Sequence, residues 1–196
     1  MLTHPGTLSG DLVRLEPLSH EHHDGLVEAV RDGELWNLWY TMVARPEAMR
    51  QEIDRRLALQ EDGSMIPFTS VRADTGEVLG MTTFMNIEAT VPRVEIGSTW
   101  NRLSAQGSGT NAEAKLMMLG HAFDVWGCIA VEFRTDYYNQ QSRQAIARLG
   151  ARQDGILRSH RNDGGYLRDT VVFSIVQQEW SGVKKGLELR LAKRRG

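Results

Sequence analysis

Cysteine is nearly absent from the chain: Cys128 is the single one among 196 residues. One thiol cannot form a disulfide within the chain, and it cannot build a cysteine-rich zinc site. No apolar run approaches the roughly 18 residues needed to span a bilayer. The first eleven residues also lack the charged and then apolar pattern of a secretory signal. These absences predict a cytoplasmic protein with no membrane partner.

An excess of one charge sign is also missing. Lys and Arg total 23 and Asp and Glu total 25, which gives a net charge of −2. A dedicated nucleic-acid-binding domain normally carries a basic excess, so we expect no nucleic acid partner. His20, His22 and His23 lie close together, but no carboxylate or cysteine cluster matches them, so we expect no metal site.

What remains is the composition of an ordinary globular protein. Hydrophobic residues make up 41% of the chain and charged residues 24%, which argues against disorder and fibrous repeats. A length of 196 residues fits one domain. We therefore expect a single domain over residues 1–196, with its core from about 8 to 180 and a basic tail from 181 to 196 that is a solvated helix end.

Hydrophobic periodicity predicts both strands and helices. The alternation over 11–18 stops at Pro17, as in an edge strand. The clearest helix covers 112–126, where apolar residues recur every three or four positions before Gly127. The other expected elements are helices near 20–35 and 46–60, a hairpin of 68–72 and 78–84, strands at 94–100 and 128–135, a helix from Asn139 to Leu149, and strands near 151–157 and 167–175. This order predicts an α/β (mixed α+β) fold, with a central mixed and mostly antiparallel sheet flanked by helices.

A glycine-containing loop leads directly into the clearest helix. Free backbone N–H groups at a helix start, with the helix dipole behind them, suit a diphosphate. A P-loop is excluded because Lys115 lies too far from Gly109. Gly107, Gly109 and Ala112 do match the dinucleotide pattern G-x-G-x-x-A. The meander before the loop and the lack of further βαβ units argue against that interpretation.

A third interpretation covers more of the chain. Glu95-Ile96-Gly97, Gln106-Gly107-Ser108-Gly109, Asn139-x-x-Ser142 and Leu149-Gly150-Ala151 follow one another in that order. Together they resemble the GNAT superfamily of acetyl-CoA-dependent N-acetyltransferases, most of all the branch of the ribosomal-protein N-terminal acetyltransferases (the RimJ/RimL type). The resemblance runs from about 12 to 176. It implies acetyl-CoA as cosubstrate, no metal, and a splay between the fourth and fifth strands, at 94–99 and 129–135, that receives the pantetheine arm.

The resemblance also assigns the cosubstrate contacts. The CoA pyrophosphate would lie on the loop of Gln106, Gly107, Ser108, Gly109 and Thr110, and the pantetheine arm on Asn139. Asn111 would complete the loop, although it stands where the family pattern has Gly or Ala. On the splayed strand, backbone N–H groups of Ile96, Gly97 and Ser98 would face the oxyanion of the tetrahedral intermediate.

Three side chains are candidates for the chemistry itself. Glu95 is the candidate base for the amine proton, and strand alternation leaves open whether it faces the cosubstrate slot or solvent. Ser142 or Tyr138 would protonate the leaving thiolate, and the alternative for Ser142 is a capping role at the helix start. No covalent acetyl-enzyme is expected, because Cys128 has no evident activating partner.

The acceptor is not fixed by the sequence. Trp36, Trp39 and Tyr40 form an aromatic cluster that is either core or the lining of the acceptor cleft, and the hairpin turn within 158–166 would border the same cleft. We expect direct transfer, in a ternary complex, to a primary amine of a protein N-terminus or a small molecule. The alternatives are a catalytically silent CoA-binding regulatory module and, third, a dinucleotide-binding protein. A homodimer is the commonest assembly for such a protein.

Overall fold

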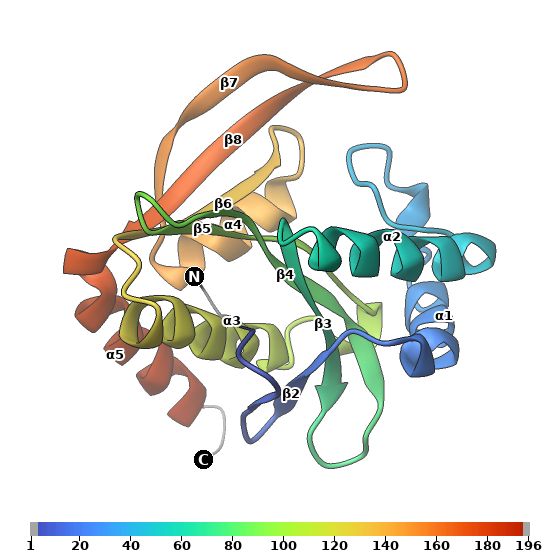
Figure 1. Cartoon of the computed structure of the whole chain (residues 1–196), viewed down its shortest axis with the longest axis horizontal. Coiled ribbons are helices and arrows are strands. Elements are labelled where there is room, and N and C mark those ends of the chain that lie inside the picture. The colour runs from blue at the N-terminus through green and yellow to red at the C-terminus, as the bar shows by residue number, and fades with distance from the viewer. Residues whose placement is uncertain (1–3, 194–196) are drawn as a thin grey trace.

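The computed structural model describes residues 4–193 and builds them into one twisted sheet with helices on both faces (Figure 1). The strands are β1 (Leu8–Ser9), β2 (Val13–Pro17), β3 (Met65–Arg72), β4 (Val78–Glu88), β5 (Arg93–Asn101), β6 (Ala130–Asp136), β7 (Arg152–Asp163) and β8 (Tyr166–Val176). The helices are α1 (His23–Arg31), α2 (Met49–Glu61), α3 (Thr110–Gly120), α4 (Gln140–Leu149) and α5 (Gln177–Ala192).

The strands lie in the order β1-β2-β3-β4-β5-β6-β8-β7. Neighbouring strands run antiparallel except β5 and β6, which are parallel. A parallel pair needs a crossover connection, and α3 supplies it between β5 and β6. The predicted fold, a mixed and mostly antiparallel sheet flanked by helices, is confirmed.

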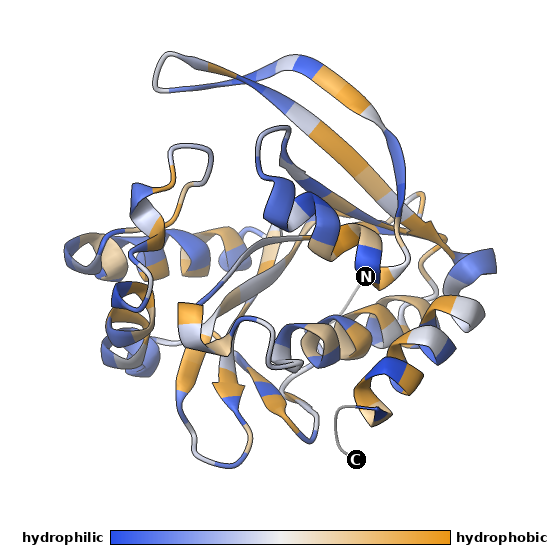
Figure 2. Cartoon of the chain, turned by 180° about the vertical axis from the view of Figure 1, so that it is seen from behind, coloured by the Kyte–Doolittle hydropathy of each residue, from blue (hydrophilic) through white to orange (hydrophobic). Residues whose placement is uncertain are grey.

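Each face of the sheet has its own apolar core. The larger core includes Phe84 and Ile96 from the strands and Met118 from α3, and residues of α4 and α5 also contribute to it. The smaller core joins Met81 and Trp100 to side chains of α1 and α2. Because side chains alternate along a strand, one strand such as β4 serves both cores. Figure 2 shows apolar stretches along the strands of the sheet.

Both ends of α4 follow the predicted signals. The Asn139 Oδ1 atom accepts a hydrogen bond from the Ser142 backbone N–H at 2.9 Å, as an N-cap does. Gly150 closes the helix at φ +102°, a left-handed conformation that glycine adopts without strain. The helix predicted from Asn139 to Leu149 is therefore confirmed, with Asn139 as its cap.

Three elements differ from the sequence expectation. β1 pairs with β2, so the strand ending at Pro17 is not the sheet edge. The helix predicted to 126 is α-helical only to Gly120 and continues as a π-helical turn over His121–Val125. The tail from 181, expected as a solvated helix end, is helical as part of α5 as far as Ala192, but it is not fully solvated: it buries Leu187 and Leu191, because these leucines recur at helical spacing.

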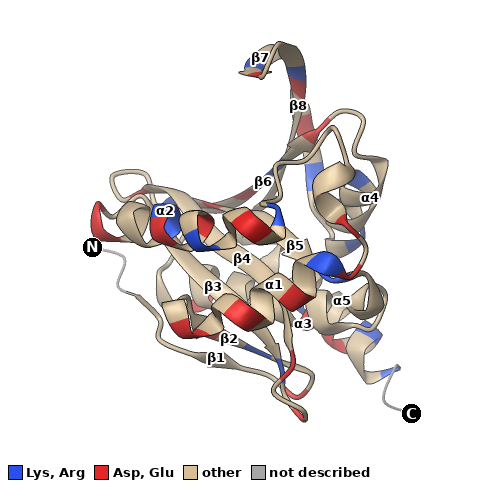
Figure 3. Cartoon of the chain, turned by 90° about the vertical axis from the view of Figure 1, so that its right-hand side faces the viewer, with Lys and Arg blue, Asp and Glu red and all other residues tan. Residues whose placement is uncertain are grey.

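The surface has two notable features, a projecting hairpin and helices on which both charge signs are mixed. The hairpin β7–β8 extends beyond the body of the sheet (Figure 1), and acidic and basic residues are interspersed along α1, α2 and α5 rather than gathered in one block (Figure 3). Among residues 4–193 no helix is long and apolar enough to cross a membrane.

Candidate functional site

A cavity of about 1010 Å³ lies where β5 and β6 separate. The pairing of these strands covers Arg93–Glu95 of β5 and Ala130–Glu132 of β6. Beyond it, both strands continue without pairing to each other, and residues of both line the cavity. The predicted splay between the fourth and fifth strands of the sequence analysis is present here, between β5 and β6.

A bulge in β5 lies at the same place. Gly97 opposes Thr83 of β4 and Trp100 opposes Met81, so three steps along β5 match two steps along β4. Ser98, inside the bulge, has φ +46°, a left-handed conformation that is uncommon for a residue with a side chain. The bulge therefore places a strained, irregular piece of backbone against the cavity.

The predicted phosphate loop forms one wall of the cavity. Gly107 and Gly109 have φ +76° and +100°, which favours glycine at both positions. Gly109 is the N-cap of α3, so the free N–H groups of this eleven-residue helix begin at the loop. Gly107, Gly109 and Asn111 all line the cavity. The hydroxyl groups of Ser108 and Thr110 lie 2.9 Å apart and stiffen the loop from within.

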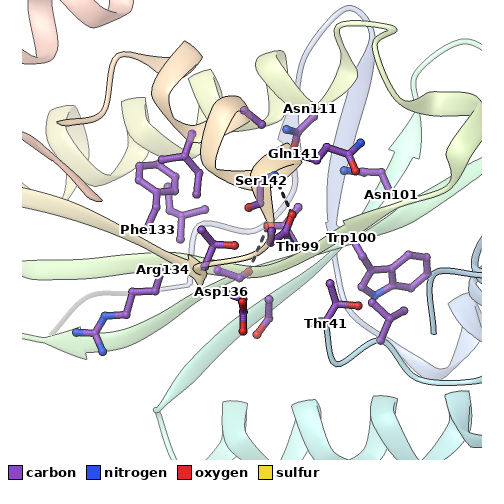
Figure 4. A pocket seen from close by; sticks show the side chains of 18 of the residues that line it. Thr41, Thr99, Trp100, Asn101, Asn111, Phe133, Arg134, Asp136, Gln141 and Ser142 are labelled. Carbon is purple, nitrogen blue, oxygen red and sulfur yellow. Dashed lines mark hydrogen bonds between the residues drawn. The ribbon is translucent and has the colours of Figure 1, made fainter. Parts of the chain in front are cut away.

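The start of α4 forms the facing wall. Asn139, Gln141 and Ser142 line the cavity, together with Thr99, Trp100 and Asn101 of β5 (Figure 4). The Gln141 side chain donates a hydrogen bond to Gln106 Oε1 at 2.7 Å and so ties α4 to the phosphate loop.

Glu95 lies in the cavity and not in solvent. The residue is 6% exposed, and its side chain lies on the same sheet face as α2. One carboxylate oxygen accepts a hydrogen bond from Asn86 Nδ2 at 2.7 Å and lies 3.5 Å from Arg134 Nε. Burial raises the pKa of Glu95, and the Asn86 hydrogen bond and the charge of Arg134 offset this only in part. Such a carboxyl group can accept a proton nearer neutral pH than an exposed one.

Gly97 makes room for this carboxylate. A Cβ atom on Gly97 would lie 2.8 Å from Glu95 Oε1 and 3.0 Å from Met85 Sδ. Residues two apart on a strand share a face, so a side chain here would displace the carboxylate of Glu95.

The other end of the cavity lies between the loop after α1 and the β7–β8 hairpin. Tyr40, Thr41 and Met42 line it from the loop, and His160 and Arg168 line it from the hairpin. The Trp39 ring joins the two sides: its centroid lies 5.1 Å from that of Tyr166, at the start of β8, and 5.3 Å from that of Tyr138.

The cavity brings most of the predicted site residues together and leaves out a few. Tyr138 is 55% exposed and, like Trp39, does not belong to the lining. Trp36 packs against the smaller core, so for this residue the core interpretation holds. The side chains of Ser108 and Thr110 also lie outside the lining. The predicted residues that do line the cavity are Tyr40, Glu95, Ile96, Gly97, Ser98, Gln106, Gly107, Gly109, Asn111, Asn139 and Ser142.

Sequence reasoning missed three buried charged residues that line the same cavity: Arg56, Lys115 and Asp136. Burial lowers the pKa of Lys115 to about 7. Asp136 accepts a hydrogen bond from the Tyr138 backbone N–H at 2.8 Å. A signal existed for Lys115, which follows Ala112 by three positions and so lies on the apolar side of the predicted helix. The same signal existed for Arg56, which follows Ile53 by three positions and so lies on the apolar side of its helix.

Cys128 is fully buried and does not line the cavity. Burial raises the pKa of its thiol to about 11, so it is protonated at neutral pH and is a poor nucleophile.

Comparison with known proteins decides the family. The acetyltransferase (GNAT) domain family matches residues 13–152, which is more than half of the chain and includes β5, the phosphate loop and α4. The chain belongs to the GNAT acetyltransferase family. It is therefore an acyltransferase by family, and enzymes of this family use acetyl-CoA.

GNAT relatives match over nearly the whole chain. The uncharacterized N-acetyltransferase p20 of Bacillus licheniformis is 26% identical over 180 residues, which cover 90% of this chain and 99% of that protein. The structure of a GCN5-related N-acetyltransferase from Brucella melitensis has a TM-score of 0.85 at 27% identity, covering 97% of this chain and 87% of that one. RimL, the ribosomal L7/L12 α-N-protein acetyltransferase, has a TM-score of 0.77 at 17% identity, covering 87% and 93%, which shows a shared fold alone.

Proposed function

We propose that this protein transfers the acetyl group of acetyl-CoA to a primary amine by direct attack in a ternary complex. The observation that carries the proposal is the continuity of one cavity: the glycine loop at the start of α3, the bulge of β5, Glu95 and the start of α4 all line it. Cosubstrate and amine can thus meet in one space, which direct transfer requires.

The residues at one end suit the phosphates of CoA. The N–H groups at the start of α3, with the helix dipole behind them, favour an anion. Gly107 and Gly109 carry no side chain that would keep phosphate oxygens away from the backbone. On this proposal Gln106, Gly107, Ser108, Gly109, Thr110 and Asn111 hold the pyrophosphate, chiefly through backbone groups, and Asn139 contacts the pantetheine arm.

Glu95 is the proposed base. It removes a proton from the ammonium group of the acceptor, directly or through water, and the free amine attacks the thioester carbonyl carbon. Its raised pKa and its place in the lining support this role. Within Ile96, Gly97 and Ser98, the backbone N–H groups that point away from β4 would stabilise the oxyanion, because β5 pairs with β6 only as far as Glu95.

The carbon–sulfur bond of the tetrahedral intermediate then breaks and the thiolate takes a proton from its donor, while the nitrogen of the new amide loses its second proton, which restores the hydroxyl of the donor. Of the two candidates, Ser142 is the one we propose as donor, since its residue lines the cavity and Tyr138 does not. The Asn139 cap engages the backbone N–H of Ser142, so its hydroxyl is not needed for the cap.

The acceptor is proposed to be a protein N-terminus or a small-molecule amine. RimL, named for acetylating the α-amino end of L7/L12, shares the fold, which is the support for a protein N-terminus. A homodimer and a cytoplasmic location stay predictions, for which sedimentation analysis and cell fractionation are the tests.

Thermal unfolding with acetyl-CoA, CoA and NADH tests the cosubstrate. At a ligand concentration about 100 times Kd, binding stabilises the folded state by about 2.7 kcal/mol. We expect Tm to rise with acetyl-CoA and CoA and to stay unchanged with NADH. A rise with NADH alone would reject the proposal. A rise with CoA together with no acetyl transfer across a panel of amines would indicate a silent CoA-binding module.

A further inference from the structure

The bulge in β5 reverses the direction in which the side chains of the strand point. Ile96 packs in the core on the α3 face, and Thr99, three positions on, contacts Lys115 of α3. In a regular strand, residues on one face are two positions apart. The extra residue, Ser98, therefore shifts the alternation by one position, so that Glu95 and Trp100, five positions apart, lie on the same face of the sheet.

α2 holds this bulge from one face of the sheet. The Arg56 guanidinium is buried and donates hydrogen bonds to the Ser98 carbonyl at 3.2 Å and to the Thr83 hydroxyl at 2.8 Å. Glu52, one turn earlier on α2, accepts a third hydrogen bond from Arg56 at 2.6 Å. This ion pair holds the guanidinium in place on α2. The position of the Ser98 carbonyl therefore depends on how α2 packs against the sheet.

α3 holds the bulge from the opposite face. Lys115 Nζ donates hydrogen bonds to the hydroxyls of Thr82 at 2.6 Å and Thr99 at 2.9 Å. Thr82 and Thr83 are adjacent on β4 and so point to opposite faces, one toward each cation. Among the described residues no carboxylate forms an ion pair with Lys115, whose residue is 4% exposed. Its two hydrogen bonds thus go to β4 and to β5, the two strands that pair at the bulge.

Burying the Arg56 guanidinium and the Lys115 amino group destabilises the fold relative to apolar residues of similar size. Their contacts converge on two successive residues, Ser98 and Thr99, and Ser98 has a left-handed backbone that the surroundings must enforce. A purely apolar packing around β5 would leave the bulge free to relax toward regular strand geometry.

We propose that Arg56 and Lys115 are positioning residues for acetyl transfer: from opposite faces of the sheet they clamp the bulge at Ser98–Thr99 and so fix the backbone of β5 that faces the cavity. This inference rests on the proposed acetyl transfer. Neither cation takes part in a bond that is made or broken. Their effect passes through the N–H groups of β5 and through Glu95, which lies three residues before Ser98.

Five variants and a control test the clamp, the fifth being Arg56→Lys. Arg56→Met and Thr83→Val weaken it on the α2 side, and Lys115→Met and Thr82→Val weaken it on the α3 side. Arg50→Met, on the exposed side of α2, is the matched control. Circular dichroism first establishes that each variant is folded, and kcat and KM are then measured with acetyl-CoA and one acceptor.

We expect kcat to fall about 10- to 100-fold in Arg56→Met and Lys115→Met, because a relaxed bulge misplaces Glu95 and the N–H groups of β5 relative to the reacting atoms. The fall should be smaller in the two valine variants. The KM for acetyl-CoA should change by less than about threefold, because the phosphate loop is untouched. Arg56→Lys, which keeps the charge, should recover part of kcat. Unchanged kcat in both methionine variants, or a rise confined to the KM for acetyl-CoA, would overturn the clamp.

Amide hydrogen exchange tests the clamp without any turnover. Residues 96–101 should exchange faster in Arg56→Met than in the wild type, while β2 and β3 stay unchanged. Equal exchange at 96–101 would overturn the clamp even where the enzyme is active. If the wild type acetylated no amine, the proposed function would fail, and the exchange experiment would still decide whether the clamp exists.

Discussion

At the scale of single residues, the account depends on where one carboxylate lies. The sequence identified Glu95 but could not decide which face of the sheet it occupies. Alternation predicts which side chains of a strand share a face, but not which of the two faces lines the cavity. The structure places it in the cavity with Asn86 and Arg134. Gly97 is part of the same arrangement, since its missing side chain leaves the space that the carboxylate occupies.

Gly97→Ala should therefore disturb catalysis more than folding. The added methyl group would lie within 3 Å of Glu95 Oε1 and push the carboxylate from its place. We expect kcat to fall at least about tenfold, which corresponds to about 1.4 kcal/mol in the barrier. Gly155→Ala is the matched control, because a Cβ atom there meets nothing within 4 Å. Steady-state kinetics of both variants give the answer, and equal kcat in the two would refute this role of Gly97.

Lys115 should make stability depend on pH. Its pKa is about 7 in the folded protein and near the ordinary 10.5 in the unfolded chain. Between these values the unfolded chain binds the extra proton, so the free energy of unfolding of the wild type rises with pH, by at most about 1.4 kcal/mol per unit from this group. Lys115→Met lacks this contribution.

Urea unfolding of wild type and Lys115→Met at pH 7, 8.5 and 9.5 measures the difference. The stability of Lys115→Met relative to the wild type should decline as pH rises through this window. A constant difference would show that the lysine titrates in the folded protein as it does in solution.

At the scale of elements, the sequence predicted what depends on local signals. The cap of α4 by Asn139 and its closure by Gly150 follow from side chains adjacent to the helix. The bulge of β5 has no such signal, because Ser98 adopts φ +46° through contacts with α2, which is about 40 residues away in the sequence. β1 and the packed part of α5 were missed for the same reason: tertiary contacts stabilise them.

Substitutions of Asn139 and Ser142 should affect different quantities, the free energy of unfolding for Asn139 and kcat for Ser142. Asn139→Ala removes the side-chain acceptor of the cap, so we expect a loss of about 0.5–2 kcal/mol in the free energy of unfolding. Ser142→Ala keeps the cap, because the cap uses the backbone N–H of Ser142. Ser142→Ala should instead lower kcat at nearly unchanged stability. Denaturant unfolding and kinetics on both variants test this, and a stable, fully active Ser142→Ala would exclude Ser142 as the proton donor.

At the scale of the whole molecule, the cavity runs from α3, where we propose that acetyl-CoA binds, to the β7–β8 hairpin, where we propose that the acceptor binds. The Trp39 ring bridges the loop after α1 to Tyr166 at the start of β8, so two distant parts of the chain meet at the acceptor end. The sequence predicted Trp39 as an acceptor residue. In the structure it lies beside the lining and not in it.

Trp39→Ala should therefore act on the acceptor and not on the cosubstrate. Losing the ring contacts with Tyr138 and Tyr166 frees the hairpin from the loop, which should raise the KM for the amine several-fold. The Tm shift caused by acetyl-CoA should stay as in the wild type, because Trp39 does not line the cavity in which we propose that acetyl-CoA binds. Kinetics with the acceptor varied, beside thermal unfolding, measure both. A changed Tm shift with an unchanged KM for the amine would contradict this division of the cavity.

The central claim is that the cavity performs amine acetylation with Glu95 as base, and kcat of Glu95→Gln against pH tests it most directly. The account predicts that the wild type loses rate toward acid pH as Glu95 becomes protonated, above the pH at which an exposed glutamate titrates. Glu95→Gln should lose about 100-fold or more of kcat and lack that acid limb, while acetyl-CoA still raises its Tm as in the wild type. A Glu95→Gln enzyme with full kcat and an unchanged pH profile would contradict the account.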